Sequence, residues 1–284
     1  MRLDQAVRHA ARRLADAGVP SPVVDAEALA AHVLGQGVAD VRRARIMGAE
    51  LPSAARTAYE ELVGRRVRRV PLQHLTGTAH FAGVDLAVGP GVFVPRPETE
   101  LMVQLALTDL EGLAAPTVVD LCTGSGALAL GLARARPDAR VGAVELSEAA
   151  FGYAARNVRA SGLAVDLRPG RAQEAFGDWA GEVDVVVSNP PYIPPDAVPR
   201  DPEVRDHDPA LALYGGGEDG LEVPLEVAAR AAVLLRPGGV LLMEHADVQG
   251  ESLPAALAAQ GWWAGVEDHP DLAGKPRVTR AVRG

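Results

Sequence analysis

The segment with the most chemical content follows a very apolar stretch and contains Asn-Pro-Pro-Tyr at residues 189–192. A primary amide is a weak nucleophile, because its nitrogen lone pair is delocalised into the carbonyl. The Asn189 side-chain oxygen and the Pro190 carbonyl can accept both N–H bonds of such an amide and aim its lone pair at a methyl group. Pro191 stiffens the segment, and Tyr192 can stack on the planar amide. The segment therefore predicts methyl transfer to an amide nitrogen by orientation, with no strong base.

A second segment, residues 118–126, predicts a strand that runs into a glycine-rich turn and then a helix. Gly124 and Gly126 let a ligand approach the backbone, and the following helix offers unpaired N–H groups. Glu145 ends the next predicted strand, where a carboxylate can accept both hydroxyls of a ribose. The pattern fits either a nicotinamide dinucleotide or S-adenosylmethionine. Asp120 modestly favours the second, because a carboxylate in the turn suits a cationic sulfonium and repels a pyrophosphate.

From Thr117 onward, apolar segments of strand length alternate with segments of helix length. The expected strands are residues 118–121, 141–145, 165–168, 183–188 and 240–244, and the expected helices are residues 127–136, 148–160 and 223–235. Apolar strands joined by helices favour a parallel sheet with helices on both faces. In such sheets ligands bind at the carboxyl ends of the strands, where both candidate segments lie. The tail from Trp262 to Val282 is expected to add an edge hairpin.

Residues 1–75 have a different character, because they contain 12 arginines, no lysine and 8 acidic residues. Apolar residues from Leu3 to Leu14 recur at steps of three and four, and further helices are expected over residues 23–34 and after Pro52. These residues therefore predict a small helical bundle. Its arginine-rich surface is either a solvated helical face or a docking face for an acidic macromolecule.

The overall composition excludes several classes of protein. The chain of 284 residues has a formal net charge of −9, and residues 76–284 carry 29 acidic against 16 basic residues, which makes this part a poor partner for a phosphate backbone. Cys122 is the only cysteine, so no intrachain disulfide can form, and the seven histidines lack metal-ligand spacing. Even the longest uncharged stretches, such as residues 252–266, are too short to cross a bilayer. We expect a cytoplasmic protein without a catalytic metal.

Several segments together resemble a known family. Residues 120–126 and 189–192 look like the amino-methyltransferases of the class I S-adenosylmethionine-dependent fold, an α/β fold with a Rossmann-like seven-stranded sheet. Further segments resemble the release-factor glutamine methyltransferases, the HemK/PrmC family, and most closely its actinobacterial members; they are residues 71–77, 93–100, 206–213 and 244–245. The resemblance covers nearly the whole chain, including the predicted helical bundle of residues 1–75, here called the helical head.

The resemblance implies transfer of a methyl group from S-adenosylmethionine, which leaves as S-adenosylhomocysteine, to the N5 side-chain nitrogen of the Gly-Gly-Gln glutamine of peptide chain release factors. It implies a helical substrate-recognition domain over residues 1–75, a β-hairpin linker over residues 76–94 and a methyltransferase domain over residues 95–284. The enzyme is expected to be a monomer that binds release factors, with no direct nucleic-acid partner and no membrane.

The implied site residues fall into three groups. The cofactor is expected to contact Asp120, Cys122, Thr123, Gly124, Ser125, Gly126, Glu145, Arg171, Ala172 and Asn189. The expected catalytic residues are Asn189, Pro190 and Tyr192, and the expected glutamine pocket is lined by Phe93, Asn189, Pro190, Pro191 and Tyr192. Arg171 departs from the family, which has Asp or Asn near the adenine ring, since an arginine cannot accept a hydrogen bond from the adenine amino group. The long proline-rich segment 193–220 is expected to be a flap over the pocket that orders on docking of the release factor.

Three other functions stay open on the sequence alone. An adenine-N6 nucleic-acid methyltransferase would share the Asn-Pro-Pro-Tyr segment, although the acidic body disfavours it. An NAD-dependent oxidoreductase would use the G-x-G-x-x-A pattern formed by Gly124, Gly126 and Ala129. A non-catalytic binding module would recognise a protein through the helical head and transfer no methyl group.

Overall fold

The computed structural model describes all 284 residues, which form two compact units. The first unit contains Met1–Thr78 and Pro199–His207, and the second contains Ala79–Val198 and Asp208–Gly284. The sequence places the end of the helical domain three residues earlier, at residue 75, and gives no sign that residues 199–207 belong with it. None of the helices combines the length and the apolar character that a membrane span requires.

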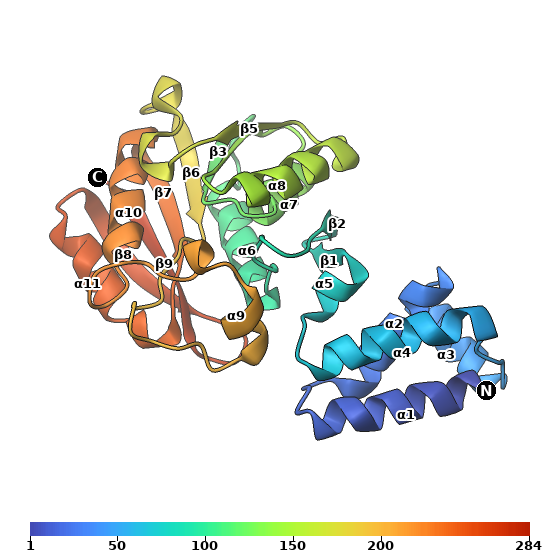
Figure 1. Cartoon of the computed structure of the whole chain (residues 1–284). Coiled ribbons are helices and arrows are strands. Elements are labelled where there is room, and N and C mark those ends of the chain that lie inside the picture. The colour runs from blue at the N-terminus through green and yellow to red at the C-terminus, as the bar shows by residue number, and fades with distance from the viewer. The chain divides into compact units, whose positions relative to one another are not determined.

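The first unit is a bundle of helices around one apolar core (Figure 1). The helices around this core are α1 (Leu3–Asp16), α2 (Pro22–Leu34), α3 (Val38–Ile46), α4 (Ser53–Val67) and α5 (Leu72–Thr76). Helix α9 (Pro202–His207) belongs to the same unit but contributes no residue to the core. The predicted apolar stripe of α1 is confirmed, because Leu3, Val7 and Leu14 are all buried. The short helices α3 and α5 are additions to the predicted bundle. In α3 only Val41 is buried, so its sequence shows no apolar repeat.

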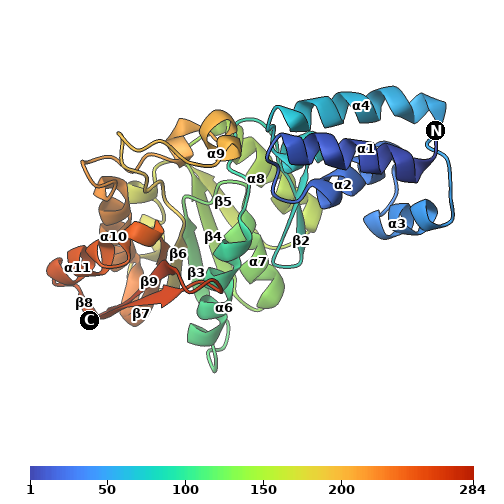
Figure 2. The same cartoon turned by 90° about the horizontal axis from the view of Figure 1, so that it is seen from below.

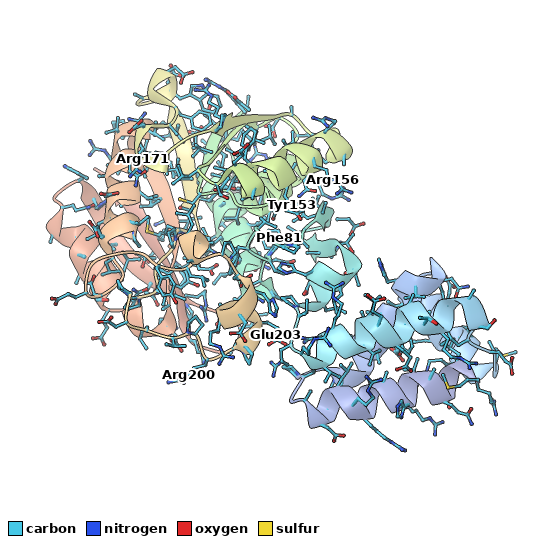
Figure 3. The ribbon with its side chains drawn as sticks, in the orientation of Figure 1. Phe81, Tyr153, Arg156, Arg171, Arg200 and Glu203 are labelled. Carbon is cyan, nitrogen blue, oxygen red and sulfur yellow. The ribbon has the colours of Figure 1, made fainter.

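Helix α9 is held in the first unit by a buried carboxylate, that of Glu203 (Figure 3). Arg66 Nη1 donates to Glu203 Oε1 at 2.6 Å, and Arg69 Nη2 donates to Glu203 Oε2 at 2.5 Å. Arg66 also donates from Nε to Asp25 Oδ2 at 2.7 Å. Burial alone would raise the pKa of Glu203, but the hydrogen bonds, that from Arg69 foremost, hold this pKa well below its usual range. The middle of the predicted flap is therefore anchored to the helical unit.

We expect Glu203→Gln to speed amide hydrogen exchange in α9 by about tenfold or more, because a neutral amide leaves two arginines without their carboxylate in a buried site. Hydrogen exchange followed by mass spectrometry measures this. Asp206→Asn is the matched control, since Asp206 lies on the same helix and pairs at the surface with its neighbour Arg205 at 2.7 Å. Equal exchange rates in both variants would show that Glu203 does not anchor α9.

The second unit contains the predicted Rossmann-like seven-stranded sheet, with strand order β5-β4-β3-β6-β7-β9-β8. The strands are β3 (Thr117–Leu121), β4 (Arg140–Glu145), β5 (Val165–Pro169), β6 (Val183–Ser188), β7 (Leu235–Glu244), β8 (Trp263–Pro270) and β9 (Pro276–Arg283). The first five are parallel, whereas β9 is antiparallel to both β7 and β8. All five predicted parallel strands and the predicted edge hairpin are confirmed, and β7 begins five residues earlier than predicted.

The parallel strands are apolar throughout because both faces of the sheet are covered. Val118 and Val185 belong to the core on one face, and their chain neighbours Val119 and Val186 belong to the core on the other. The first face is covered by α6 (Glu100–Asp109), α7 (Ala127–Ala135) and α8 (Glu148–Ser161), and the second by α10 (Glu222–Leu234) and α11 (Ser252–Ala259). Figures 1 and 2 show these two layers of helices on either side of the sheet.

Short elements complete the description of the chain. The β-hairpin expected within residues 76–94 is present as a two-stranded sheet of β1 (Thr78–Phe81) and β2 (Val84–Ala87). Single 3₁₀ turns lie at η1 (Pro97–Thr99), η2 (Ala172–Glu174), η3 (Gly177–Trp179), η4 (Ala210–Ala212) and η5 (Asp247–Gln249). Three of them, η1, η2 and η4, contribute residues to the pocket described next.

Candidate functional site

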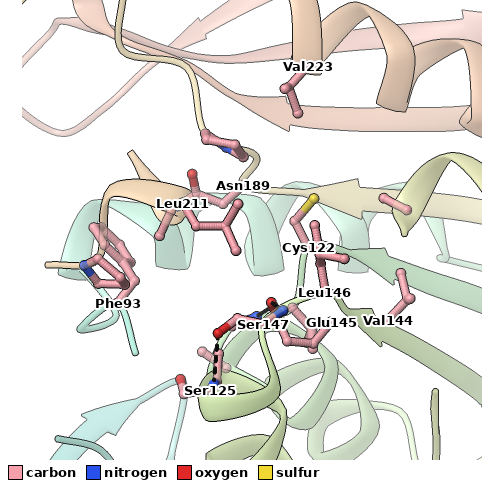
Figure 4. Close-up of a pocket in the computed structure, with 18 of the residues that line it drawn as sticks. Phe93, Cys122, Ser125, Val144, Glu145, Leu146, Ser147, Asn189, Leu211 and Val223 are labelled. Carbon is pink, nitrogen blue, oxygen red and sulfur yellow. Dashed lines mark hydrogen bonds between the residues drawn. The ribbon is translucent and has the colours of Figure 1, made fainter. Parts of the chain in front are cut away.

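A pocket of the second unit lies at the carboxyl ends of β3, β4 and β6, where parallel sheets bind their ligands (Figure 4). It brings together both segments that the sequence singles out. The predicted site residues that line it are Phe93, Cys122, Thr123, Gly124, Ser125, Glu145, Arg171, Ala172, Asn189 and Pro191. Asp120, Gly126, Pro190 and Tyr192 are not among its lining residues.

The glycine-rich turn after β3 leaves room for a ligand. Gly124 has a φ of +59°, and a Cβ built on it would meet no atom within 4 Å. The Ser125 hydroxyl lines the pocket, is buried and has no hydrogen-bond partner in the protein. A ligand can therefore approach the main chain at Gly124 closely. The Ser125 hydroxyl beside it is available to form a hydrogen bond with a polar ligand such as an amino-acid group.

Asp120 stabilises this turn by hydrogen bonds and is not among the residues that line the pocket. Its side chain is fully buried, and its Oδ2 accepts hydrogen bonds from Thr123 Oγ1 at 2.5 Å and from the Ala129 amide at 3.1 Å. Burial raises the pKa of Asp120 to about 7. These two hydrogen bonds tie the turn to the start of α7, whereas Asp120 Oδ1 has no hydrogen-bond partner in the protein. The expected contact of this carboxylate with a cationic ligand stays a prediction.

Glu145, at the end of β4, is the carboxylate that does face the pocket. Its Oε2 accepts a hydrogen bond from the Gly124 amide at 2.8 Å, and its Oε1 accepts one from the Ser147 amide at 2.7 Å. Burial raises the pKa of Glu145, and these backbone N–H groups oppose the shift because they stabilise the carboxylate. The backbone therefore fixes the carboxylate beside the glycine turn, where it can accept ribose hydroxyls.

We expect Glu145→Gln to weaken binding of S-adenosylhomocysteine by about tenfold or more, because hydrogen bonds to a charged acceptor contribute roughly 1.5–3 kcal/mol. Isothermal titration calorimetry measures this affinity directly. Glu148→Gln provides the control, since Glu148 is exposed in the first turn of α8 and does not line the pocket. An unchanged dissociation constant for Glu145→Gln would remove Glu145 from the ribose site.

The Asn-Pro-Pro-Tyr segment lies at the tip of β6. Ser188 Oγ donates to the Leu121 carbonyl at 2.5 Å and ties this tip to the end of β3. Asn189 lines the pocket (Figure 4), whereas the Tyr192 hydroxyl lies 3.5 Å from Glu244 Oε1. Burial raises the pKa of Tyr192 above its usual range. The expected stacking of Tyr192 on a bound amide stays a prediction, and Phe93 is the expected aromatic residue that lines the pocket.

A buried glutamine that carries no sequence motif supports the tip. Gln249 Nε2 donates to the carbonyls of Tyr192 and Asp219, each at 2.9 Å. The Leu213 carbonyl accepts hydrogen bonds from the Tyr192 and Ile193 amides at 3.1 and 2.8 Å. These contacts hold the main chain after Asn189 between η5 and the returning end of the flap. Only the tertiary structure reveals the role of Gln249.

The predicted flap contributes directly to the pocket. Its returning half lines the pocket with Pro209, Leu211, Ala212 and Tyr214. Asp208, at the start of this half, accepts a hydrogen bond from Arg96 Nη2 at 2.7 Å. The Arg96 guanidinium in turn lies 5.0 Å from the centre of the Phe93 ring. Arg96 therefore forms an ion pair with Asp208 and also lies against an aromatic residue of the pocket wall.

The end of the pocket expected to hold the adenine ring is formed by residues after β5. Gly170, Arg171, Ala172 and Gln173 line it, and Arg171 is labelled in Figure 3. The Gly170 amide donates to the Glu145 carbonyl at 2.9 Å, which joins this end to the ribose end. Main-chain groups and the Gln173 amide are therefore available where Arg171 cannot accept a hydrogen bond.

Comparisons with known proteins agree with this geometry. Residues 5–77 match the model of the PrmC N-terminal domain, and residues 73–200 match that of the methyltransferase small domain. A release factor glutamine methyltransferase from Streptomyces coelicolor is 51% identical over 279 residues, which cover 97% of this chain and 96% of the relative. The chain belongs to the release factor glutamine methyltransferase family. Family membership makes it an S-adenosylmethionine-dependent enzyme, which decides against the dinucleotide and the non-catalytic module that the sequence left open.

Two further comparisons mark the limits of this similarity. A 4-amino-L-phenylalanine/4-methylamino-L-phenylalanine methyltransferase from Streptomyces pristinaespiralis is 41% identical, with 94% of this chain and 91% of the relative covered. A 16S rRNA methyltransferase from Thermus thermophilus, solved with AdoMet and guanosine, has a TM-score of 0.53 at 24% identity and covers 73% of this chain and 50% of its own. The second shares the fold. The Streptomyces pristinaespiralis enzyme shows that proteins about 41% identical to this chain include one whose name gives an aromatic amine as substrate.

Proposed function

We propose that this enzyme methylates the N5 side-chain nitrogen of the Gly-Gly-Gln glutamine in peptide chain release factors. The observation that carries the proposal is the presence of Asn189 in the same pocket as the Gly124 turn and Glu145. An amide-binding group and a cofactor-binding turn that share one cavity can bring a carboxamide to the methyl donor. The 51% identical relative is named a release factor glutamine methyltransferase, and its match covers 97% of this chain, so that it includes residues of both units.

S-adenosylmethionine supplies an electrophilic methyl group on a positively charged sulfur, and leaves as the neutral thioether S-adenosylhomocysteine. In the proposal, Glu145 accepts the ribose hydroxyls, and the Gly124 turn with the Ser125 hydroxyl holds the amino-acid end. Asn189 Oδ1 accepts one N–H of the glutamine amide, and the carbonyl of Pro190, the next main-chain acceptor at the tip, accepts the other. These two hydrogen bonds hold the nitrogen in line with the methyl carbon. The methylated nitrogen then loses a proton to water.

The proposal extends to partners and location. We further propose that the enzyme acts as a monomer. Residues 76–284 are strongly acidic, which favours a protein substrate over a bare nucleic acid. Because release factors act on ribosomes, the proposed reaction takes place in the cytoplasm.

The test is incubation of the enzyme with S-adenosylmethionine and a bacterial release factor, followed by mass spectrometry of the Gly-Gly-Gln peptide. We expect one added methyl group on the loop glutamine, and none on a release factor whose loop glutamine is replaced by alanine. Parallel reactions contain adenine-containing duplex DNA or free 4-amino-L-phenylalanine, the second because of the aromatic-amine relative. Methyl transfer to either of these, with none to the release factor, would overturn the proposal.

A further inference from the structure

A buried carboxyl group, that of Glu244, lies directly behind the pocket at the end of β7. In the parallel pairing of β6 with β7, Ser188 lies opposite Met243, so the next residues of the two strands, Asn189 and Glu244, are neighbours at the strand tips. Glu244 is 1% exposed and does not itself line the pocket. Its carboxylate therefore acts on a ligand only through other side chains.

Polar side chains in and behind the pocket wall lie near this carboxylate. Glu244 Oε1 lies 3.5 Å from the Tyr192 hydroxyl, and Glu244 Oε2 is buried without a hydrogen-bond partner in the protein. The side chain of Thr99, which lines the pocket, is also buried. Burial raises the pKa of Glu244, and hydrogen bonding by the side chains of Thr99 and Asn189 opposes this shift. The side chains of Thr99 and Asn189 are therefore near enough to interact with the Glu244 carboxylate.

The chemistry of a carboxylate decides which way the neighbouring amide points. An asparagine side chain has nearly the same shape with its oxygen and nitrogen exchanged, so packing alone does not select between the two orientations. An ionised carboxylate only accepts hydrogen bonds. Next to Glu244, the Asn189 NH₂ group is therefore favoured on the protein side, which leaves Asn189 Oδ1 on the pocket side.

We propose that Glu244 is a positioning residue, whose carboxylate orients the Asn189 carboxamide so that its oxygen accepts an N–H of the substrate amide. The inference rests on the proposed function, because only an N–H donor in the substrate makes this orientation the productive one. Glu244 touches neither substrate nor cofactor in this account. Its effect appears in turnover and not in cofactor affinity.

The surroundings of Glu244 make the orientation sensitive to pH. Burial raises the pKa of Glu244 to about 7, Thr99 and Arg277 of β9 oppose the shift, and Glu98 of η1 adds to it. Tyr192, whose pKa is itself raised, is the group that faces Glu244 from the tip of β6. A protonated Glu244 has an O–H to donate and favours the reversed Asn189. Single-turnover methyl transfer should therefore rise about tenfold from about pH 6 to about pH 8.

The test is Glu244→Gln, assayed by single-turnover methyl transfer to the release factor. We expect a loss of about 10- to 100-fold at about pH 8, an almost flat pH profile, and unchanged affinities for S-adenosylhomocysteine and release factor. If Glu244 had only a structural role, its replacement would change folding or ligand affinity, and the variant would keep the pH dependence of the wild-type transfer rate. Glu244→Asp keeps an acceptor-only group and should restore both part of the rate and the pH dependence.

Asp184→Asn is the matched control, since Asp184 lies at the opposite end of β6 and binds the Thr117 amide at 2.7 Å and Arg236 Nε at 2.6 Å. It should leave rate and pH profile unchanged. A wild-type rate independent of pH, or a Glu244→Gln variant with the wild-type rate and profile, would overturn the inference. If Glu244→Gln does not fold, the wild-type profile and Glu244→Asp carry the test. A wild type that leaves release factor unmethylated would instead overturn the proposed function.

Discussion

Asn189→Ala should lower single-turnover methyl transfer to the release factor by about 10²-fold or more, which corresponds to roughly 3 kcal/mol of lost transition-state stabilisation. The alanine removes the carboxamide oxygen that, in the proposal, accepts one N–H of the substrate amide. The strand tip itself should persist, because Ser188 and the carbonyl of Tyr192 keep their partners Leu121 and Gln249. Rapid-quench measurement with labelled cofactor gives the rate, and circular dichroism checks folding.

The matched control removes a different amide from the same pocket. Gln173 lines the end expected to hold the adenine ring, and its Nε2 donates to Glu226 Oε2 at 2.7 Å. Gln173→Ala should change the affinity for S-adenosylhomocysteine more than the rate of transfer. A transfer rate in Asn189→Ala within about fivefold of the wild type would contradict catalysis by amide orientation.

The sequence predicts the sheet well because each parallel strand is buried on both faces. A continuous apolar run, such as residues 183–188, is typical of a central strand that is covered on both faces. The helices between such strands connect them by right-handed crossovers, which leaves few possible topologies. The weakly amphipathic helix α3 shows the opposite case, since one buried residue produces no repeat. Helix α9 is harder still. Its place in the first unit depends on Glu203 meeting Arg66 and Arg69, a long-range pairing that no local pattern displays.

The same distinction applies to the site. Gly124 and Glu145 are recognisable because the chain itself fixes their relation, one at the end of β3 and the other at the end of the adjacent β4. The direction of a side chain is not fixed in this way. Asp120 precedes the turn as expected, yet it points to the start of α7, and Tyr192 points to Glu244. Spacing therefore predicts which strand ends meet, whereas burial and hydrogen bonding decide which side chains reach the pocket.

Gly220→Ala is expected to have a large effect although Gly220 does not line the pocket. A Cβ on Gly220 would lie 2.2 Å from the Tyr192 carbonyl oxygen and 2.8 Å from the Pro194 nitrogen, and the residue has a φ of +79°. Both contacts are to main chain, so the strand tip must move to admit one methyl group. We expect transfer to fall about 10²-fold and the free energy of unfolding to fall by about 2–4 kcal/mol. Affinity for S-adenosylhomocysteine should change little, because Gly124 and Glu145 belong to other strand ends.

Gly261→Ala separates the close contact from the backbone strain. Gly261 has a φ of +74°, close to that of Gly220, but a Cβ there would meet no atom within 4 Å. This control should therefore lose only the roughly 1 kcal/mol that a left-handed conformation costs a residue with a side chain, and keep full transfer activity. Chemical denaturation and rapid-quench assays measure both variants. If the two alanines destabilise the protein equally and leave the rate unchanged, the main-chain contact between Gly220 and Tyr192 does not hold the Asn189 tip in its catalytic position.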